Sequence, residues 1–347
     1  MLAAVLEDLN QLTLKELPTP EIDADSALLR VESVSVCGSD IRIFRHGNPR
    51  VVPPAIIGHE TSGVVVKVGE NVTRVKEGDR VAIGADVPCG QCWWCRNGLG
   101  NNCAINYAVG YQIPGAFAQY MKLPRLLLEE GPVTPFSDKI SFDTASLAEP
   151  LGCAINGLEI VNMSIGRTVA IMGLGPIGCM MIDLARVMGA VKVIAIQRSR
   201  KRLEIARAYN ADVYICTEDE DVVQRCREET GGEGPNIVVT TSGSVEAHEQ
   251  AIEMVSHRGY VNLFGGLPKG TRPMSVLSNT IHYKECFVTG SHGCVPRHHE
   301  IAVRLLENGS VRTEPIITHH FPLSRIHEAF AAMESRQGMK IVVHPQA

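Results

Sequence analysis

Four of the eleven cysteines lie close together, with a spacing that suits a single metal ion: Cys89, Cys92, Cys95 and Cys103. Two residues between successive cysteines let a short loop wrap around one cation, and four thiolates complete the tetrahedral shell of Zn²⁺. Gly90 and Gly98 permit the turns that such a loop needs. Because this shell leaves no position for a substrate, the cluster predicts a structural zinc. The alternatives are an iron–sulfur cluster and four unrelated buried thiols.

A second set of metal-ligand types consists of Cys37, His59 and Glu60. Cys37 opens the motif Cys-Gly-Ser-Asp at the end of a β-rich run, and His59 follows a proline-rich turn. Glu149 adds a carboxylate at the predicted junction of two domains, where substrate and cofactor would meet. A thiolate, an imidazole and a carboxylate leave one coordination position open, which is typical of a catalytic zinc.

A glycine-rich turn predicts a dinucleotide site. It follows the apolar run Thr168–Met172, opens a helical pattern and consists of Gly173, Leu174, Gly175, Pro176, Ile177 and Gly178. In this context the first glycine permits a tight turn, the second lets the backbone approach a pyrophosphate, and the third allows the helix to pack closely on the strand. The N-terminus of the helix then faces the phosphates.

The end of the next strand indicates which dinucleotide binds. An NAD-binding chain normally has an acidic residue there to accept hydrogen bonds from the adenosine ribose, whereas this chain has Gln197. Donors and cations follow it, namely Arg198, Ser199, Arg200, Lys201 and Arg202. Because these suit a 2′-phosphate, we favour NADP and keep NAD as the second possibility. The plainer alternative is that they are solvated residues at the start of a helix.

The elements that must position these residues differ between two parts of the chain. Up to about residue 150, short β-rich runs alternate with glycine and proline turns. From about residue 165, apolar runs alternate with helical patterns, and the predicted strands are Thr168–Met172, Val191–Ile196, Asp212–Ile215, Ile237–Thr241 and Tyr260–Phe264. This alternation predicts a doubly wound parallel sheet of the Rossmann type. The tail from about residue 286 is expected to pack back onto the first domain.

Composition narrows the class of protein. The chain has 347 residues, of which 45% are hydrophobic and 20% charged, so it is long enough for two domains and too apolar to be disordered. The net charge is −5 and no basic stretch is long enough to bind a polyanion, which argues against a nucleic-acid partner. No uninterrupted apolar run would span a membrane, and the first residues lack the features of a secretory signal. We therefore expect a cytoplasmic enzyme.

Together these motifs resemble the zinc-dependent medium-chain alcohol dehydrogenases, and within them the sorbitol (L-iditol) and threonine dehydrogenase branch. The resemblance spans nearly the whole chain, and besides the cysteine cluster and the glycine turn it rests on residues 37–40, 58–60, 78–81, 149–151, 264–270 and 281–285. It implies an α/β fold with a β-rich GroES-like catalytic domain and a doubly wound Rossmann coenzyme domain. The catalytic domain would comprise residues 1–150 and 286–347, with a structural zinc lobe at 86–104. The coenzyme domain would comprise residues 151–285.

The resemblance also implies roles for individual residues. Cys37 and His59 would ligate a catalytic zinc, so that the chain would hold two Zn²⁺ ions. Glu60 and Glu149 would lie near this zinc, and which of them ligates it directly stays open. Ser39 would be the first acceptor of the substrate proton, and the nicotinamide would project into the cleft between the domains.

Two positions depart from the family pattern. Many relatives have a histidine at the position of Arg42, where it helps to pass a proton to solvent, and arginine cannot act as a general base. His46, Glu60 or water would then complete a relay that starts at Ser39, or Arg42 would bind a phosphate or carboxylate of the substrate. The branch also often has a histidine where this chain has Asn156.

The implied reaction is reversible hydride transfer between a secondary alcohol or polyol and a nicotinamide cofactor, as between a sugar alcohol and its ketose. Threonine and sugar-alcohol phosphates are the alternative substrates. A zinc-free quinone or enoyl reductase of the superfamily would lack both predicted metal sites. The alternative from another class is a non-catalytic sensor that binds zinc and a nucleotide. The family also implies a homodimer or homotetramer.

Overall fold

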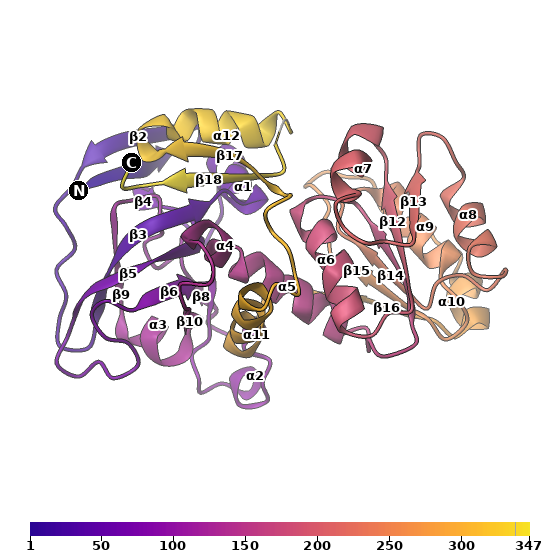
Figure 1. Cartoon of the computed structure of the whole chain (residues 1–347), viewed down its shortest axis with the longest axis horizontal. Coiled ribbons are helices and arrows are strands. Elements are labelled where there is room, and N and C mark those ends of the chain that lie inside the picture. The colour runs from indigo at the N-terminus through magenta and orange to yellow at the C-terminus, as the bar shows by residue number, and fades with distance from the viewer. Residues whose placement is uncertain (337) are drawn as a thin grey trace. The chain divides into compact units, whose positions relative to one another are not determined.

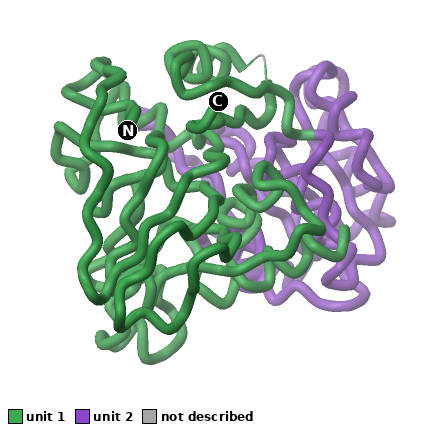
Figure 2. The backbone as a smooth tube through the Cα atoms, turned by 60° about the vertical axis from the view of Figure 1, so that its left-hand side comes forward, with its two compact units in different colours: residues 1–152, 293–309, 316–347 green, residues 153–292, 310–315 purple. Residues whose placement is uncertain are grey.

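A computed structural model describes residues 1–336 and 338–347, and Figure 1 shows its elements. The chain forms two units, which Figure 2 shows in different colours. Unit 1 contains Met1–Gly152, Gly293–Gly309 and Ile316–Ala347, and unit 2 contains Cys153–His292 and Ser310–Pro315. Each unit therefore combines segments that lie far apart in the sequence.

Unit 1 is built on a seven-stranded sheet with β3 (Ala27–Ser35) in a central position. β3 pairs antiparallel with β5 (Glu60–Val68) and β18, and β9 also pairs with it. The strand order is β10-β6-β5-β3-β18-β17. The remaining bounds are β6 Arg80–Ile83, β9 Tyr120–Leu123, β10 Val133–Pro135, β17 Ile317–Pro322 and β18 Lys340–His344. Most residues of β3 are buried, as expected of a central strand rich in Val and Leu.

Two smaller sheets and several helices complete unit 1. One sheet has the order β2-β1-β4 and the other pairs β7 with β8. These strands are β1 Leu2–Asp8, β2 Gln11–Glu16, β4 Ala55–Ile56, β7 Asp86–Val87 and β8 Tyr107–Ala108. The helices are α1 Gly38–His46, α2 Trp93–Arg96, α3 Arg125–Glu130, α4 Phe142–Ser146, α11 Pro296–Glu307 and α12 Ile326–Glu334, with 3₁₀ turns at Gly100–Asn102 and Leu323–Arg325.

The core of unit 1 joins the C-terminal helix to the first helix of the chain. Phe330 of α12 packs edge-on against Phe44 of α1, with ring centroids 5.5 Å apart, and against Phe117 at 5.7 Å. All three belong to one buried cluster with aliphatic residues of β3 and β18. In Figure 1, α12 lies along β17 and β18. Because α1 starts immediately after Cys37, this packing orients the segment that carries a predicted metal ligand.

Unit 2 is a parallel sheet with the order β13-β12-β11-β14-β15-β16. Its strands are β11 Thr168–Met172, β12 Lys192–Gln197, β13 Val213–Cys216, β14 Ile237–Thr240, β15 Tyr260–Leu263 and β16 Phe287–Gly290. The connecting helices are α6 Pro176–Val187, α7 Arg200–Ala206, α8 Val222–Glu228, α9 Val245–Met254 and α10 Ser278–Lys284, and α5 Ala148–Glu159 runs from unit 1 into unit 2. Central strands such as β14 are buried throughout, which is typical of a parallel sheet covered on both faces.

The predicted fold class, an α/β chain with a β-rich part and a Rossmann-like part, is confirmed. The five strands predicted for the second part occur with ends that differ by at most one residue from the prediction. The sequence did not predict β16, one of the two edge strands of this sheet, whose first and last residues are exposed. Among the described residues, no helix combines the length and apolar content that crossing a membrane requires.

Candidate active site

The pairing of two strands brings the predicted catalytic residues together. β3 and β5 run antiparallel with Ser35 opposite Glu60, so the end of one strand lies beside the start of the other. Cys37 follows β3 and His59 precedes β5. One ligand atom from each of Cys37, His59 and Glu60 lies within 4.8 Å of the other two. The donor set of thiolate, imidazole and carboxylate suits Zn²⁺ with an open position.

His59 is buried and lies between a carboxylate and a hydroxyl. Its Nδ1 is 3.3 Å from Oδ1 of Asp40, and its Nε2 is 3.2 Å from the Ser39 hydroxyl oxygen. Burial by itself lowers the pKa of His59, but Asp40 and Cys37 more than offset it, so the pKa is raised well above its usual value. The anionic groups that favour a proton on this imidazole also favour a metal cation beside it. Asp40 further accepts a hydrogen bond from the Cys37 N–H at 2.9 Å.

Glu60 is held by a buried lysine. Lys340, the first residue of β18, forms an ion pair with Oε2 of Glu60, and the Ser35 hydroxyl donates to the same oxygen. Glu60 is 1% exposed and Lys340 is 3% exposed. Burial lowers the pKa of Lys340, but Glu60 and the other nearby anions raise it further, so the pKa is above its usual value and the ammonium form persists. The sequence did not point to Lys340 as a site residue.

Glu149 differs from Glu60 in its electrostatic environment. It lies in the first turn of α5 and is buried. Its burial, together with the negative charges of Glu60 and Asp86, raises its pKa to about 7, although His59 and Lys340 act in the opposite direction. Glu149 is outside the group whose ligand atoms lie within 4.8 Å of one another. The geometry therefore favours Glu60 over Glu149 as a member of the ligand group.

An aromatic residue that the sequence analysis missed lines the same site. The ring centroid of Tyr111 is 6.0 Å from that of His59, and the guanidinium of Arg50 lies 4.9 Å above the Tyr111 ring. Burial raises the pKa of Tyr111, and a hydrogen bond with Ser39 opposes this shift. Tyr111 follows the short strand β8, and no motif surrounds it that could have identified it from the sequence.

The four-cysteine cluster has the dimensions of a tetrahedral zinc site. The Sγ atoms of Cys92 and Cys95 lie 3.4 Å apart, those of Cys89 and Cys95 lie 3.9 Å apart, and Cys92 is 4.0 Å from Cys103. Zn–S bonds of about 2.3 Å place tetrahedral sulfurs roughly 3.8 Å apart. All four are free thiols in one group. Backbone N–H groups of Ala104 and Cys95 lower the pKa of Cys92 to about 6, whereas burial and the neighbouring thiols raise the pKa of Cys95 to about 12, so Cys92 loses its proton more readily than Cys95.

The glycine turn between β11 and α6 has the backbone that a dinucleotide requires. Gly173 has φ of +100°, which favours glycine. A β-carbon at Gly178 would lie 2.0 Å from the carbonyl oxygen of Gly173, so helix and turn are in direct contact. At Gly175, by contrast, the nearest atom to such a carbon is Arg202 Nη1 at 3.9 Å, which leaves space beside the N-terminus of α6. These residues fit a bound pyrophosphate.

The residues at the end of β12 and directly after it differ in their contacts, because some bind other parts of the protein and others are exposed to solvent. The side-chain amide oxygen of Gln197 accepts a hydrogen bond from the Leu174 N–H at 2.8 Å, so this side chain is directed to the glycine turn. Arg200 forms a 2.7 Å ion pair with Asp219. Arg198 is exposed, and Ser199 is the N-cap residue of α7.

The arginines near the catalytic residues also differ in whether they bind another residue of the protein. Arg45 binds both carboxylate oxygens of Glu334 at 2.6 and 2.7 Å. Arg42 is exposed and forms no ion pair or hydrogen bond with any described residue. His46 is exposed at the end of α1. Asn156, in α5, donates to the carbonyl of His292 at 3.3 Å.

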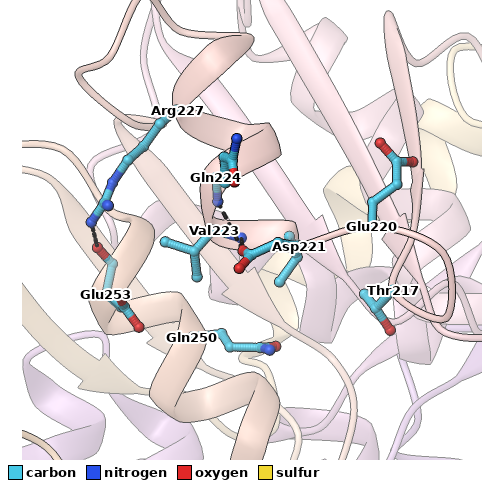
Figure 3. A pocket seen from close by; sticks show the side chains of 9 residues that line it. Thr217, Glu220, Asp221, Val223, Gln224, Arg227, Gln250 and Glu253 are labelled. Carbon is cyan, nitrogen blue, oxygen red and sulfur yellow. Dashed lines mark hydrogen bonds between the residues drawn. The ribbon is translucent and has the colours of Figure 1, made fainter.

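A surface hollow in unit 2 has none of the predicted site residues in its lining, although the backbone N–H of Thr217, which lines it, donates to the Gln197 carbonyl at 3.1 Å. It has a volume of about 310 Å³ and is lined by α8, α9 and the residues before α8 (Figure 3). Asp221 accepts from the backbone N–H groups of Val223 and Gln224, and Arg227 donates to the Glu253 carbonyl. These groups therefore serve the ends of the helices, and the hollow contains none of the predicted ligands.

Comparison with known proteins gives the same family for both parts of the chain. Residues 23–131 match the family model described as alcohol dehydrogenase GroES-like domain, and residues 176–308 match the one described as zinc-binding dehydrogenase. The L-threonine 3-dehydrogenase of Bacillus licheniformis is 35% identical over 334 residues, with 94% of each chain covered. The D-arabitol-phosphate dehydrogenase of Enterococcus avium is 31% identical, covering 96% of this chain and 94% of the relative. The sorbitol dehydrogenase of Bacillus subtilis is 29% identical, covering 99% and 97%.

Solved structures with the same fold include complexes with both dinucleotides. A zinc-binding dehydrogenase from Sinorhizobium meliloti bound to NADP has a TM-score of 0.92 and 27% identity, with 99% of each chain covered. An alcohol dehydrogenase from Escherichia coli in complex with NADH has a TM-score of 0.89 and 26% identity, with the same coverage. The likeness in fold therefore does not decide between the two cofactors.

Replacing Lys340 by methionine should destabilise unit 1. The change leaves the buried Glu60 carboxylate without its cation, which we expect to cost about 3–5 kcal/mol in the free energy of unfolding. Urea unfolding followed by far-UV circular dichroism measures this loss. Adding Glu60→Gln should restore most of it, because the remaining charge is then removed.

Lys122→Met is the matched control for this substitution. Lys122 forms an ion pair with Asp23 at the surface of the same unit, 2.8 Å from its carboxylate. Such an exposed pair should contribute less than about 1 kcal/mol. Equal stability of the Lys340→Met and Lys122→Met variants would contradict the role assigned to Lys340.

Proposed function

Since the chain belongs to the zinc-containing medium-chain alcohol dehydrogenase superfamily and is a zinc-dependent NAD(P) dehydrogenase, we propose that it interconverts a secondary alcohol or polyol with its ketone. The observation that carries the proposal is the buried group of Cys37, His59 and Glu60 with Ser39 beside the imidazole. The relatives named above act on an amino acid, a sugar-alcohol phosphate and a sugar alcohol, which all carry hydroxyl groups.

In the proposed mechanism, Cys37, His59 and Glu60 would hold the catalytic zinc, and the four cysteines from Cys89 to Cys103 would hold the structural one. When bound, zinc supplies the Lewis acid that promotes loss of the hydroxyl proton, and the nicotinamide accepts the hydride. Asp40 orients His59 through its Nδ1 atom and keeps the site anionic. Lys340 fixes Glu60 in place and offsets its charge.

Ser39 is the proposed first acceptor of the substrate proton. Its hydroxyl lies 3.2 Å from Nε2 of His59, so it borders the ligand group and can both accept and donate a hydrogen bond. Tyr111 lies beside this group, because its hydroxyl interacts with Ser39 and its ring centroid is 6.0 Å from that of His59. Arg42 lies one helical turn beyond Ser39 and cannot take the next proton, so water or His46 would complete the path.

Removing the metal or the Cys37 thiol should abolish turnover. We expect a zinc chelator to eliminate oxidation of sugar alcohols and simple secondary alcohols, and Cys37→Ala to lower kcat/KM at least about 1,000-fold, because several kcal/mol of transition-state stabilisation are lost. Steady-state assays on a substrate panel, with zinc content measured in parallel, test this. Readdition of Zn²⁺ to the chelated wild-type enzyme is the control. Unchanged turnover after the zinc has been removed would contradict the proposal.

We also propose that NADP is the preferred cofactor. The position of the ribose-binding acid is occupied by Gln197, whose side-chain amide oxygen already accepts a hydrogen bond from the Leu174 N–H. Arg198 is exposed directly after it, and Arg202 borders the open side of Gly175. A 2′-phosphate would therefore meet cationic donors rather than a carboxylate.

Arg198→Ala should weaken NADP selectively. Loss of a charge-assisted hydrogen bond to a phosphate, about 1.5–3 kcal/mol, predicts a fall of roughly 10- to 100-fold in kcat/KM for NADP, with the value for NAD within about 3-fold of wild type. Arg200→Ala is the matched control, because Arg200 is already paired with Asp219 and should change kcat/KM for NADP by less than about 3-fold. A wild-type preference for NAD of tenfold or more would show that the NADP assignment is wrong.

A second candidate substrate class carries an anionic group. Arg42 is a solvent-exposed cation that has no ion pair or hydrogen bond among residues 1–336 and 338–347, and it lies one helical turn from Ser39. The neighbouring Arg45 is neutralised by Glu334. A carboxylate, as in threonine, or a phosphate ester of a sugar alcohol would complement Arg42.

Arg42→Met distinguishes the two substrate classes. If the substrate is anionic, we expect kcat/KM for threonine or sugar-alcohol phosphates to fall roughly 10- to 100-fold, with turnover of neutral polyols within about 3-fold of wild type. Arg45→Met is the control on the same helix and should leave kcat/KM unchanged for both the anionic substrates and the neutral polyols. If no anionic compound is a substrate and Arg42→Met leaves polyol turnover intact, the anionic candidate is excluded and the polyol candidate stands.

A further inference from the structure

A third group of potential metal ligands lies in unit 1, and neither the sequence motifs nor the proposed reaction uses it. It consists of Asp143, His320 and His344, which each offer one ligand atom within 4.8 Å of the others. Oδ1 of Asp143 is 2.8 Å from Nε2 of His344, and Oδ2 of Asp143 is 3.3 Å from Nδ1 of His320. One carboxylate thus lies between two imidazoles and contacts each with a different oxygen.

Strand pairing places the two histidines on one face of the sheet. β17 and β18 run parallel with His320 opposite Val342 and Pro322 opposite His344, so the two histidines are offset by two residues and point to the same side. Their rings lie 5.4 Å apart with an interplanar angle of 28°. The two imidazoles are therefore brought together by the backbone and not by chance contact of flexible side chains.

Asp143 is held opposite these rings by the local structure of α4. The helix begins with Ser141 as its N-cap, whose hydroxyl accepts from the Thr144 N–H at 3.1 Å. Ser62 of β5 donates to the Phe142 carbonyl at 2.6 Å, which ties the start of the helix to the sheet. Asp143 stands in this first turn, where a negative charge is favoured by the helix dipole.

The charges of the group favour a divalent cation over protons alone. Burial raises the pKa of Asp143, but hydrogen bonds with His344 and Ser33 and the charges of the two histidines outweigh it, so the pKa is lowered and the group is a carboxylate at neutral pH. The hydrogen bond to Asp143 raises the pKa of His344. Protonation of both stacked imidazoles would place two positive charges beside one carboxylate. A divalent ion bound to two neutral imidazoles and the carboxylate avoids that repulsion.

From this geometry we propose that Asp143, His320 and His344 form an additional Zn²⁺ site. Ligand bonds of about 2.0–2.1 Å place tetrahedral N and O ligands roughly 3.3 Å apart. The distances from Asp143, each from a different carboxylate oxygen, are 3.3 Å to His320 and 2.8 Å to His344. The His320 side chain is 50% exposed, so it can rotate to bring its Nδ1 atom within ligand distance of the ion. Water would complete the coordination because the site opens to solvent, so this zinc should exchange more readily than zinc held by four thiolates.

Zinc at this site would cross-link distant parts of unit 1. Asp143 belongs to the first segment of the unit, and both histidines belong to the last, Ile316–Ala347. The ion would therefore pin β17 and β18 to α4, and it would stabilise the folded unit because an ion that binds only the native state shifts the folding equilibrium. The proposal does not rest on the dehydrogenase activity.

The test counts zinc bound by the full-length enzyme beyond the zinc it holds as purified. The protein is dialysed against buffers with free Zn²⁺ from nanomolar to millimolar, and bound zinc is measured by mass spectrometry. We expect one additional equivalent in the wild type, and at least tenfold weaker binding of that equivalent in His320→Asn and His344→Asn. The unfolding midpoint of the wild type should rise with zinc, and those of the two variants should not.

His319→Asn is the matched control. His319 lies on the same strand beside His320 and contacts Thr318, not Asp143, at 2.9 Å. It should retain both the additional zinc and the rise in midpoint. The proposal is overturned if the wild type binds no additional zinc up to about 1 mM, or if His320→Asn and His344→Asn bind it as His319→Asn does.

Discussion

The candidate active site depends on one buried ion pair, between Lys340 and Glu60. Both residues stand at the first position of their strands, β18 and β5, and both are almost fully buried, so an unpaired charge there would be strongly unfavourable. β3 pairs with β5 on one side and with β18 on the other, and Ser35 stands at both junctions. The pair can form only when all three strands are in register, so the last strand of the chain must be in place before the site is complete.

The sequence predicted those site residues whose geometry is set by their neighbours in the chain. Cys89 to Cys103 and the turn from Gly173 to Gly178 each lie within one short segment, and spacing alone indicates the geometry that they adopt. Lys340 is different, because it lies 280 residues from Glu60 and nothing near it distinguishes it from any lysine at the start of a strand. Tyr111 was missed for the same reason. The edge strand β16 was missed because it is short and half exposed, so it lacks the apolar run that marks the other strands.

Charged residues show a second limit of the sequence. The sequence alone does not distinguish Arg42 and Arg198 from Arg45 and Arg200. In the structure, Arg45 forms an ion pair with Glu334, and Arg200 forms one with Asp219. Such partners come from distant elements, so a count of basic residues overstates the number that can meet a ligand. Gln197 shows the converse, because its side chain serves the glycine turn instead of standing free at the strand end. In each basic cluster, some of the arginines are therefore already paired with a carboxylate of the protein.

The three ligand groups of unit 1 differ in the two properties that govern how tightly zinc is held. The cysteine cluster offers four soft anionic ligands, the group at Cys37 is buried beside further carboxylates, and the group at Asp143 offers neutral imidazoles and one carboxylate at the surface. Affinity should fall in that order because the number of anionic ligands decreases, and the group at Asp143 is also the most exposed of the three. β18 connects the last two groups, with Lys340 at its start and His344 at its end. An ion at the exposed group would therefore hold the strand whose first residue positions Glu60.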